Sequence, residues 1–218
     1  MAKLVWDAVG EHLYETGVRN GVLYPQAANG TYPAGVAWNG LTAITESPSG
    51  ADATALYADD IKYLELRAAE EFGGTIEAYT YPDEWAACDG SATPSTGVTI
   101  GQQPRTPFGL CYRTVIGNDT QRDDHGYKLH LIYNATASPS ERAYQTINDS
   151  PDAITFSWEF TTTPVNITGT NYKPTACIII DSTKVDSTKL GLLEDKLYGG
   201  TNSTAMLPDP ATVLSDLA

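Results

Sequence analysis

The chain has 218 residues, with 27 acidic against 13 basic side chains and a formal net charge of −14, which excludes non-specific binding to DNA. The number and spacing of its cysteines, Cys88, Cys111 and Cys177, predict neither a disulfide framework nor a zinc site. The first residues lack the apolar core of a signal peptide, so we expect a soluble protein made in a cytoplasm. The length fits one large all-β domain, and no internal repeat or break in composition divides it.

The first third of the chain mixes turn formers with short apolar runs. Residues 20–35 contain several glycines and two prolines, which favours an extended arm or loop over a core strand. Strand patterns begin at Val36, and the Asn39–Gly40 pair predicts either a hairpin turn or, as we prefer, a bulge in one continuous strand. We therefore treat residues 1–35 as an N-terminal arm and residues 36–200 as a β core.

Residues 57–90 combine two period-two patterns with an excess of acid. Leu64, Leu66 and Ala68 alternate with polar residues on one arm, and Ile76 and Ala78 do so on the other. The intervening AEEFGG predicts a bend at Gly73 and Gly74, with Glu70 and Glu71 at a solvated tip. This pattern fits either a projecting arm or an ordinary hairpin at the rim of a sandwich. Residues 46–89 hold eleven acids against two bases, which makes this segment the most acidic of the chain.

A short helix and four strands are predicted next. Pro82, followed by two acids, predicts a helical turn that ends by Gly90. The alternation in residues 108–115 and 127–133 predicts a second hairpin, whose polar turn has no predicted role. Residues 154–160 form the cleanest strand pattern, and the continuous apolar run at 176–180 predicts a strand buried on both faces.

The apolar period changes near the C-terminus. Leucines three and four residues apart predict one amphipathic helix over residues 187–198, with Ser187 as its N-cap and Gly199 after its end. Asp209 and Pro210 open a second short apolar segment, which we interpret as part of a C-terminal arm over residues 201–218. The predicted fold is therefore mainly β, a sandwich or barrel-like core with one flanking α-helix and a long projecting hairpin.

The sequence contains none of the common catalytic signatures, so we expect no enzymatic activity and no cofactor. His12, His125 and His130 lie on separate elements, and each is more readily explained as structural or exposed than as a metal ligand. The acidic turn Asp119, Asp123, Asp124 lacks the alternate spacing of a calcium loop, which disfavours a metal site.

Long runs of the sequence, rather than a catalytic motif, carry a resemblance to a known family. The runs are GVLYP, YPAGVAWNGLTAITESPSGADATALYADD, IKYLELRAAEEFGGTIEAYTYPDEWAACDG, GQQPRTPFGLCYRTVIGND, HGYKLHLIYNATASPSERAYQTIND, TFSWEFTTTPV and LYGG. They resemble the major tail tube proteins of bacteriophages with long, non-contractile tails that infect Gram-positive hosts, and of related prophages. The resemblance covers almost the whole chain.

This resemblance implies a structural virion protein that assembles into stacked hexameric rings. The implied partners are other copies of the chain, the tape measure protein, the tail terminator and the distal tail or baseplate proteins, while DNA passes through without specific binding and no membrane is involved. The implied location is the tail of the virion, and the host cytoplasm during assembly. Candidate contacts between subunits come from the predicted hairpin tip and the two arms: Glu70, Glu71, Phe72, Gly73, Gly74, Leu23, Tyr24 and Leu214.

Two points stay open at the level of the sequence. The resemblance does not identify which acidic residues line the channel. A different class of function, a non-catalytic β-sandwich that binds carbohydrate or a host surface, is indicated by four tryptophans and thirteen tyrosines. Core packing accounts for Trp38, Trp85 and Trp158, which disfavours this alternative.

Overall fold

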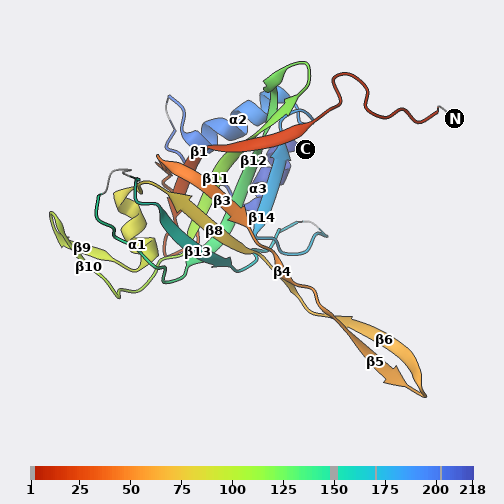
Figure 1. The fold of residues 1–218 in the computed structure, drawn as a ribbon, viewed down its shortest axis with the longest axis horizontal. Coiled ribbons are helices and arrows are strands. Elements are labelled where there is room, and N and C mark those ends of the chain that lie inside the picture. Colours follow the sequence, from red (N-terminus) through yellow and green to blue (C-terminus); the bar gives the residue numbers. More distant parts are fainter. Residues whose placement is uncertain (1–2, 148–151, 170, 202) are drawn as a thin grey trace.

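The computed structural model describes residues 3–147, 152–169, 171–201 and 203–218 and is mainly β, as predicted (Figure 1). Its strands are β1 (Tyr14–Pro25), β2 (Val36–Ala37), β3 (Leu41–Glu46), β4 (Ser49–Gly50), β5 (Ala53–Ala58), β6 (Ile61–Arg67), β7 (Glu70–Glu71), β8 (Gly73–Ala78), β9 (Ala92–Ser95), β10 (Val98–Ile100), β11 (Phe108–Asn118), β12 (Arg122–Ala137), β13 (Phe156–Thr162) and β14 (Cys177–Asp181). Its helices are η1 (Asp83–Trp85), α1 (Ala86–Asp89), α2 (Ser187–Tyr198) and α3 (Pro210–Leu217).

The main sheet curls until its two ends approach each other. Its strand order is β2-β1-β11-β12-β13-β8-β3, with β14 also paired to β12. β2 and β3 stand at opposite ends of this order, yet only residues 38–40 separate them in the chain. The Trp38 N–H donates to the Gly21 carbonyl at 2.8 Å, so the end of β2 stays against β1 while the chain turns into β3. The fold is therefore barrel-like rather than a flat sheet.

Asn39 and Gly40 make this crossing. Gly40 has φ +77°, a value that favours glycine, and the pair forms a turn between strands that bond to different neighbours. The preferred interpretation of a bulge in one continuous strand is therefore wrong.

The prediction of an arm over residues 20–35 is wrong for its first part. Residues 20–25 belong to β1, which pairs with β11, and Val22, Leu23 and Tyr24 are buried. The register shifts twice between Thr16 and Val22, with positive φ at Gly17 and Asn20. Asn20, at the start of the stretch that we expected to be a loop, thus lies at a bulge in a core strand. Met1 and Ala2 lie outside the described residues.

Tryptophans fill the interior of the barrel. The rings of Trp38 and Trp85 are 4.7 Å apart, and those of Trp85 and Trp158 are 5.4 Å apart. Trp85 comes from the short helix η1, which is continued by α1 and ends at Gly90 in a left-handed conformation. The predicted helical turn is confirmed, and its tryptophan helps to hold the sheet in its curled form.

The outer face of the sheet is covered by α2 and α3. Leu190, Leu193 and Leu197 of α2 are buried, as their spacing predicts. The N-cap is Asp186 instead of Ser187, because the Asp186 carboxylate accepts hydrogen bonds from the backbone N–H groups of Thr188 and Lys189.

Helix α3 corrects the predicted C-terminal arm. Asp209 caps it and Pro210 begins it, as expected. The helix nevertheless packs against the body: Val213 is fully buried and Leu214 is half-buried. Residues 203–218 are thus part of the fold, and Asn202 lies outside the described residues.

Two predicted strands need smaller corrections. The strand predicted at residues 154–160 is β13, which begins at Phe156 and extends to Thr162. β14 bonds to β12, but Ile179 is 50% exposed, so the prediction that this strand is buried on both faces is wrong.

Candidate assembly interface

A long ribbon of two strands leaves the body of the molecule (Figure 1). We define the projecting hairpin as residues 49–71, in which β4 pairs with β7 and β5 pairs with β6. It continues β3 and β8 of the main sheet beyond the barrel. Every residue of β6 is exposed, and only Ala55 of β5 is half-buried. Residues 53–67 therefore have almost no packing within their own chain.

The tip of this hairpin lies at Asp59 and Asp60, so the predicted bend at Gly73 and Gly74 is wrong. The two aspartates have φ +50° and +61° and connect Ala58 to Ile61, which pair across the turn. Positive φ at both central residues is the mark of a type I′ turn, for which aspartate is among the tolerated residues. The Asp59–Asp60 pair was the sequence feature that could have indicated this turn. The prediction relied on the Gly73–Gly74 pair instead.

The hairpin has an apolar and a polar face. Leu56 lies opposite Leu64, and Thr54 opposite Leu66, so these side chains share one face. The other face carries Glu65 and Arg67. The three leucines are between 38% and 55% exposed, and Tyr57, Ile61 and Tyr63 near the tip are exposed further. A two-stranded hairpin is marginally stable alone in water, so this apolar face is a surface that a partner would cover.

The projecting hairpin is also acidic, with Asp59 and Asp60 at its tip and Glu70 and Glu71 at its base. The projecting hairpin holds six acids and two bases, a net charge of −4. Lys62 and Arg67 both lie beside Glu65. The remaining acids, for which no ion pair is present among the described residues, are Asp52, Asp59, Asp60, Glu70 and Glu71.

Glu46 fixes the base of the hairpin to the body. Its carboxylate lies 2.9 Å from His130 Nδ1 and accepts a hydrogen bond from the Tyr112 hydroxyl at 2.5 Å. The rings of Tyr112 and His130 stack with centroids 4.6 Å apart. The bond to His130 lowers the pKa of Glu46 below its usual range, the Tyr112 bond adds to this, and burial opposes both. One side chain thus joins the end of β3 to β11 and β12.

We expect the Glu46 carboxylate to make the free energy of unfolding depend on pH. Because the pKa of Glu46 is lower in the folded chain than its ordinary 4.5, its contribution is complete above about pH 4.5 and is lost as pH falls through the folded-state pKa. Glu46→Gln should lower the free energy of unfolding by about 1.5 kcal/mol at pH 7. Urea unfolding at pH 7 and pH 3 should show a smaller difference between the two pH values in this variant than in the native chain. An unchanged difference would contradict the role, and Glu71→Gln, at an exposed carboxylate, is the matched control.

The sequence-predicted contact residues fall into two groups. Glu70 and Glu71 are exposed on β7, and Phe72 is half-buried against Phe160. Leu23 and Tyr24 are fully buried, and Tyr24 donates its hydroxyl hydrogen to the Leu197 carbonyl, so their assignment as contacts with a neighbour is wrong.

The remaining candidates are largely enclosed. Gly73 is half-buried and Gly74 buried at the base of the hairpin, and Leu214 is half-buried on α3. The prediction did not include the exposed apolar side chains of β5 and β6 among the contact candidates, although their alternation was visible in the sequence.

The β11–β12 turn, whose role the sequence left open, holds the N-terminal segment. The Asp119 carboxylate accepts a hydrogen bond from the Gly10 N–H at 2.9 Å and lies 3.0 Å from His12 Nδ1. The Asn118 side-chain amide donates to the Gly10 carbonyl. The His12 contact lowers the pKa of Asp119, and the Gly10 N–H adds to this. His12 and Asp119 thus connect the N-terminal segment to the β11–β12 turn.

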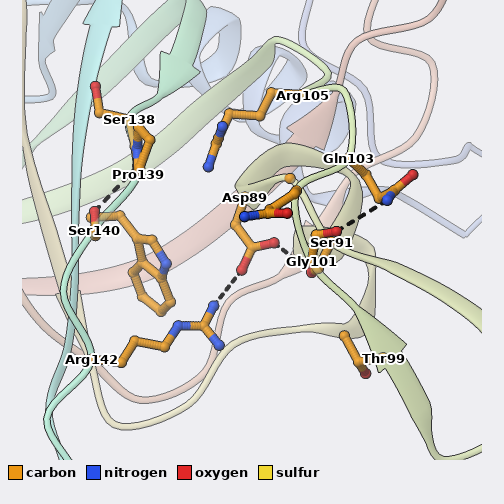
Figure 2. Close-up of a pocket in the computed structure, with 13 residues that line it drawn as sticks. Asp89, Ser91, Thr99, Gly101, Gln103, Arg105, Ser138, Pro139, Ser140 and Arg142 are labelled. Carbon is orange, nitrogen blue, oxygen red and sulfur yellow. Dashed lines mark hydrogen bonds and ion pairs between the residues drawn. The ribbon is translucent and has the colours of Figure 1, made fainter.

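A polar pocket of about 610 Å³ lies on the other side of the body, beside β9 and β10 (Figure 2). Figure 2 shows the Arg142 guanidinium directed at the Asp89 carboxylate, which also accepts a hydrogen bond from the Ser91 hydroxyl. Trp158 contributes to the pocket wall but is only 2% exposed. The pocket therefore offers polar groups without an open aromatic face on which a sugar would stack.

Other kinds of site find little support in the part of the chain that the structure describes. Among those residues, no group of three or more histidine, cysteine, aspartate or glutamate side chains is arranged to hold a metal ion. None of the described helices is long and apolar enough to cross a membrane. Comparison of the sequence with models of known protein families and with curated proteins gives no match.

Proposed function

We propose that this chain is a structural subunit that assembles with its own copies into the tail tube of a bacteriophage. The observation that carries the proposal is the projecting hairpin, whose apolar face has no partner among the described residues of its own chain. The sequence resemblance supplies the type of assembly: hexameric rings that stack around a tape measure protein and later conduct DNA. The terminator and distal tail proteins would close its two ends.

The barrel-like body suits such an assembly. A rigid core with an amphipathic ribbon that reaches beyond it can contact a neighbouring copy without rearrangement of the core. Apolar area on the hairpin would be buried between subunits, and the exposed acids around it would remain in water. Each unit of the tube would then depend on its neighbour to cover surface that the monomer leaves exposed.

The charge of the chain is compatible with DNA transit. A tube that conducts DNA must not retain phosphate groups, and 27 acids against 13 bases make such retention unfavourable. At about 0.1 M salt, repulsion between exposed acids and phosphates extends over a Debye length of roughly 10 Å. An acidic wall therefore keeps DNA from adhering while it passes.

The alternative of a carbohydrate-binding module finds less support. Trp38, Trp85 and Trp158 are at most 3% exposed, so three of the four tryptophans have no free face for a sugar ring. Their contacts with one another account for them as core residues.

Electron microscopy of the purified protein at rising concentration tests the proposal. We expect rings and tubes with a continuous central channel. A chain that stays monomeric at all concentrations and binds glycans on an array would overturn it.

We also expect assembly to depend on ionic strength. Subunits with a formal net charge of −14 repel one another, and the Debye length falls from about 30 Å at 0.01 M salt to about 8 Å at 0.15 M. Light scattering should therefore show a lower critical concentration for assembly as sodium chloride is raised over this range. Equal critical concentrations at both salt levels would contradict the electrostatic part of the proposal.

A further inference from the structure

Arg105 is a half-buried cation that has no partner among the described residues. Its Nε atom is enclosed without a hydrogen bond, and no carboxylate of those residues lies within 4 Å of its guanidinium. The other arginines of the chain either pair with a carboxylate or are exposed to water: Arg67, Arg113 and Arg142 form the first group, Arg19 and Arg122 the second. Arginine stays charged at any ordinary pH, so the unbalanced charge of Arg105 lowers the stability of the monomer.

Two backbone hydrogen bonds fix the position of Arg105. The Gln103 N–H donates to the Gly90 carbonyl and the Thr106 N–H to the Ala87 carbonyl, each at 2.9 Å, so residues 103–106 are fastened to the end of α1. The Arg105 guanidinium packs directly on Gly90, where a Cβ atom would lie 2.9 Å from Arg105 Cζ. The guanidinium therefore occupies a position that is set by the backbone on either side of it.

Arg105 lines the polar pocket of about 610 Å³ beside β9 and β10. Figure 2 shows its side chain reaching the pocket from the side opposite Arg142. Arg142 pairs with Asp89, the one acid among the described residues of the lining, so these two charges balance each other. The pocket thus has one unbalanced positive charge, in a chain whose formal net charge is −14.

The charge and shape of this site favour a carboxylate group. A single negative charge balances that of Arg105, whereas a phosphate dianion would exceed it beside Asp89. Because the Nε atom is enclosed, the two terminal Nη atoms remain to bind a ligand, and the two oxygens of a carboxylate match this pair. Pro139 and Trp158 contribute to the pocket wall, and their apolar surface strengthens the attraction between opposite charges.

We propose that this pocket is a binding site for a carboxylate group, which the Nη atoms of Arg105 hold end-on. The Arg142–Asp89 pair forms part of the wall and adds no net charge. The inference goes beyond the proposed function, since the site is complete within one monomer. Two sources supply the same chemistry: a small free carboxylate, and an acidic side chain of another copy of this chain.

Titration of the monomer with acetate, followed by NMR of the nitrogen-labelled chain, tests the site. The signals of Gly90 and Gln103 should shift saturably when acetate replaces chloride at constant ionic strength and neutral pH. Arg105→Gln should weaken binding about tenfold or more, because charged hydrogen bonds are lost. Arg122→Gln removes the same charge at an exposed position and should bind acetate as the native chain does. Shifts that do not saturate, or that are equal in Arg105→Gln, would overturn the proposal.

Thermal unfolding separates a binding role of Arg105 from a structural one. Arg105→Met nearly keeps the length of the side chain and removes the unbalanced charge, so it should raise the midpoint of unfolding by about 3 °C. Saturating acetate should raise the midpoint of the native chain and leave that of Arg105→Met unchanged. A lower midpoint in Arg105→Met would mean that the arginine stabilises the monomer itself, and the proposal would then be wrong.

The critical concentration for assembly distinguishes the two sources of the carboxylate. If the group belongs to another copy, Arg105→Gln should raise this concentration about tenfold, and acetate should raise it for the native chain. If the group belongs to a free acid, both changes should leave assembly as it is. Either result supports the site and assigns its ligand. A monomer that does not bind acetate would leave the proposed tube intact, whereas a chain that binds acetate and never forms tubes would contradict the tube alone.

Discussion

A chain in which residues 52–68 are replaced by an Asn-Gly turn should fold normally and fail to form tubes. The replaced residues contain β5 and β6, whose side chains are almost all exposed. The cut lies where the Ala51 N–H donates to the Ala69 carbonyl, so the new turn would close the ribbon that remains. Because a two-stranded hairpin adds little stability by itself, the free energy of unfolding should change by less than about 1 kcal/mol. Thermal unfolding and electron microscopy measure the two effects separately.

The charge of the removed segment does not account for this result. Residues 52–68 carry four acids and two bases, a net charge of −2, against −14 for the whole chain. Two double variants test the apolar and the polar face of the hairpin separately. Leu64→Thr with Leu66→Thr should weaken assembly, and Glu65→Gln with Arg67→Gln should leave it nearly unchanged. Normal tubes from the truncated chain would mean that the hairpin is an ordinary surface loop.

Local patterns predicted much of the fold, since they record contacts between residues close in sequence. The leucine spacing located α2, and Asp209 with Pro210 located the start of α3. Alternation located β11, β12 and β13 to within a few residues. Alternation also predicted an amphipathic strand at residues 63–68, and β6 of the projecting hairpin confirms it.

The errors arose where a distant part of the chain decides the structure. Residues 20–25 look like a loop because they begin a stretch with several glycines and two prolines, but pairing with β11 makes them a core strand. The apolar segment of α3 looks like an arm until the outer face of the sheet provides its partner. The contact between Glu46 and His130 joins residues 84 positions apart, and no local pattern indicates it.

Gly73 and Gly74 show how one sequence feature supports two opposite interpretations. Paired glycines occur at tight bends, where positive φ is needed, and in strands, where another backbone approaches closely. The structure has the second case: both glycines lie in β8, between β3 and β13, and neither has a positive φ. The bend at the tip is made by aspartates instead. The glycines therefore belong to the rigid base of the hairpin.

Among single glycine-to-alanine changes in the β core, Gly74→Ala should lower the free energy of unfolding most. A Cβ at this position would lie 2.2 Å from the Thr45 carbonyl oxygen and 2.9 Å from the Phe160 ring. The first of these atoms belongs to the backbone of β3, so β3 must move away from β8 to relieve the overlap. Overpacking of this kind costs about 3 kcal/mol. Urea unfolding of the monomer, monitored by tryptophan fluorescence, measures the loss.

The same change at Gly191 is the control, because a Cβ there meets no atom within 4 Å. Gly191 lies on the exposed side of α2, where alanine should stabilise the helix by up to about 1 kcal/mol. Opposite signs for the two glycine-to-alanine changes would show that Gly74 is required for space between strands. A neutral effect at Gly74 would mean that β3 and β8 separate easily. The hairpin that continues both strands would then have no fixed direction relative to the barrel, and a rigid contact with a neighbouring copy would lose its physical basis.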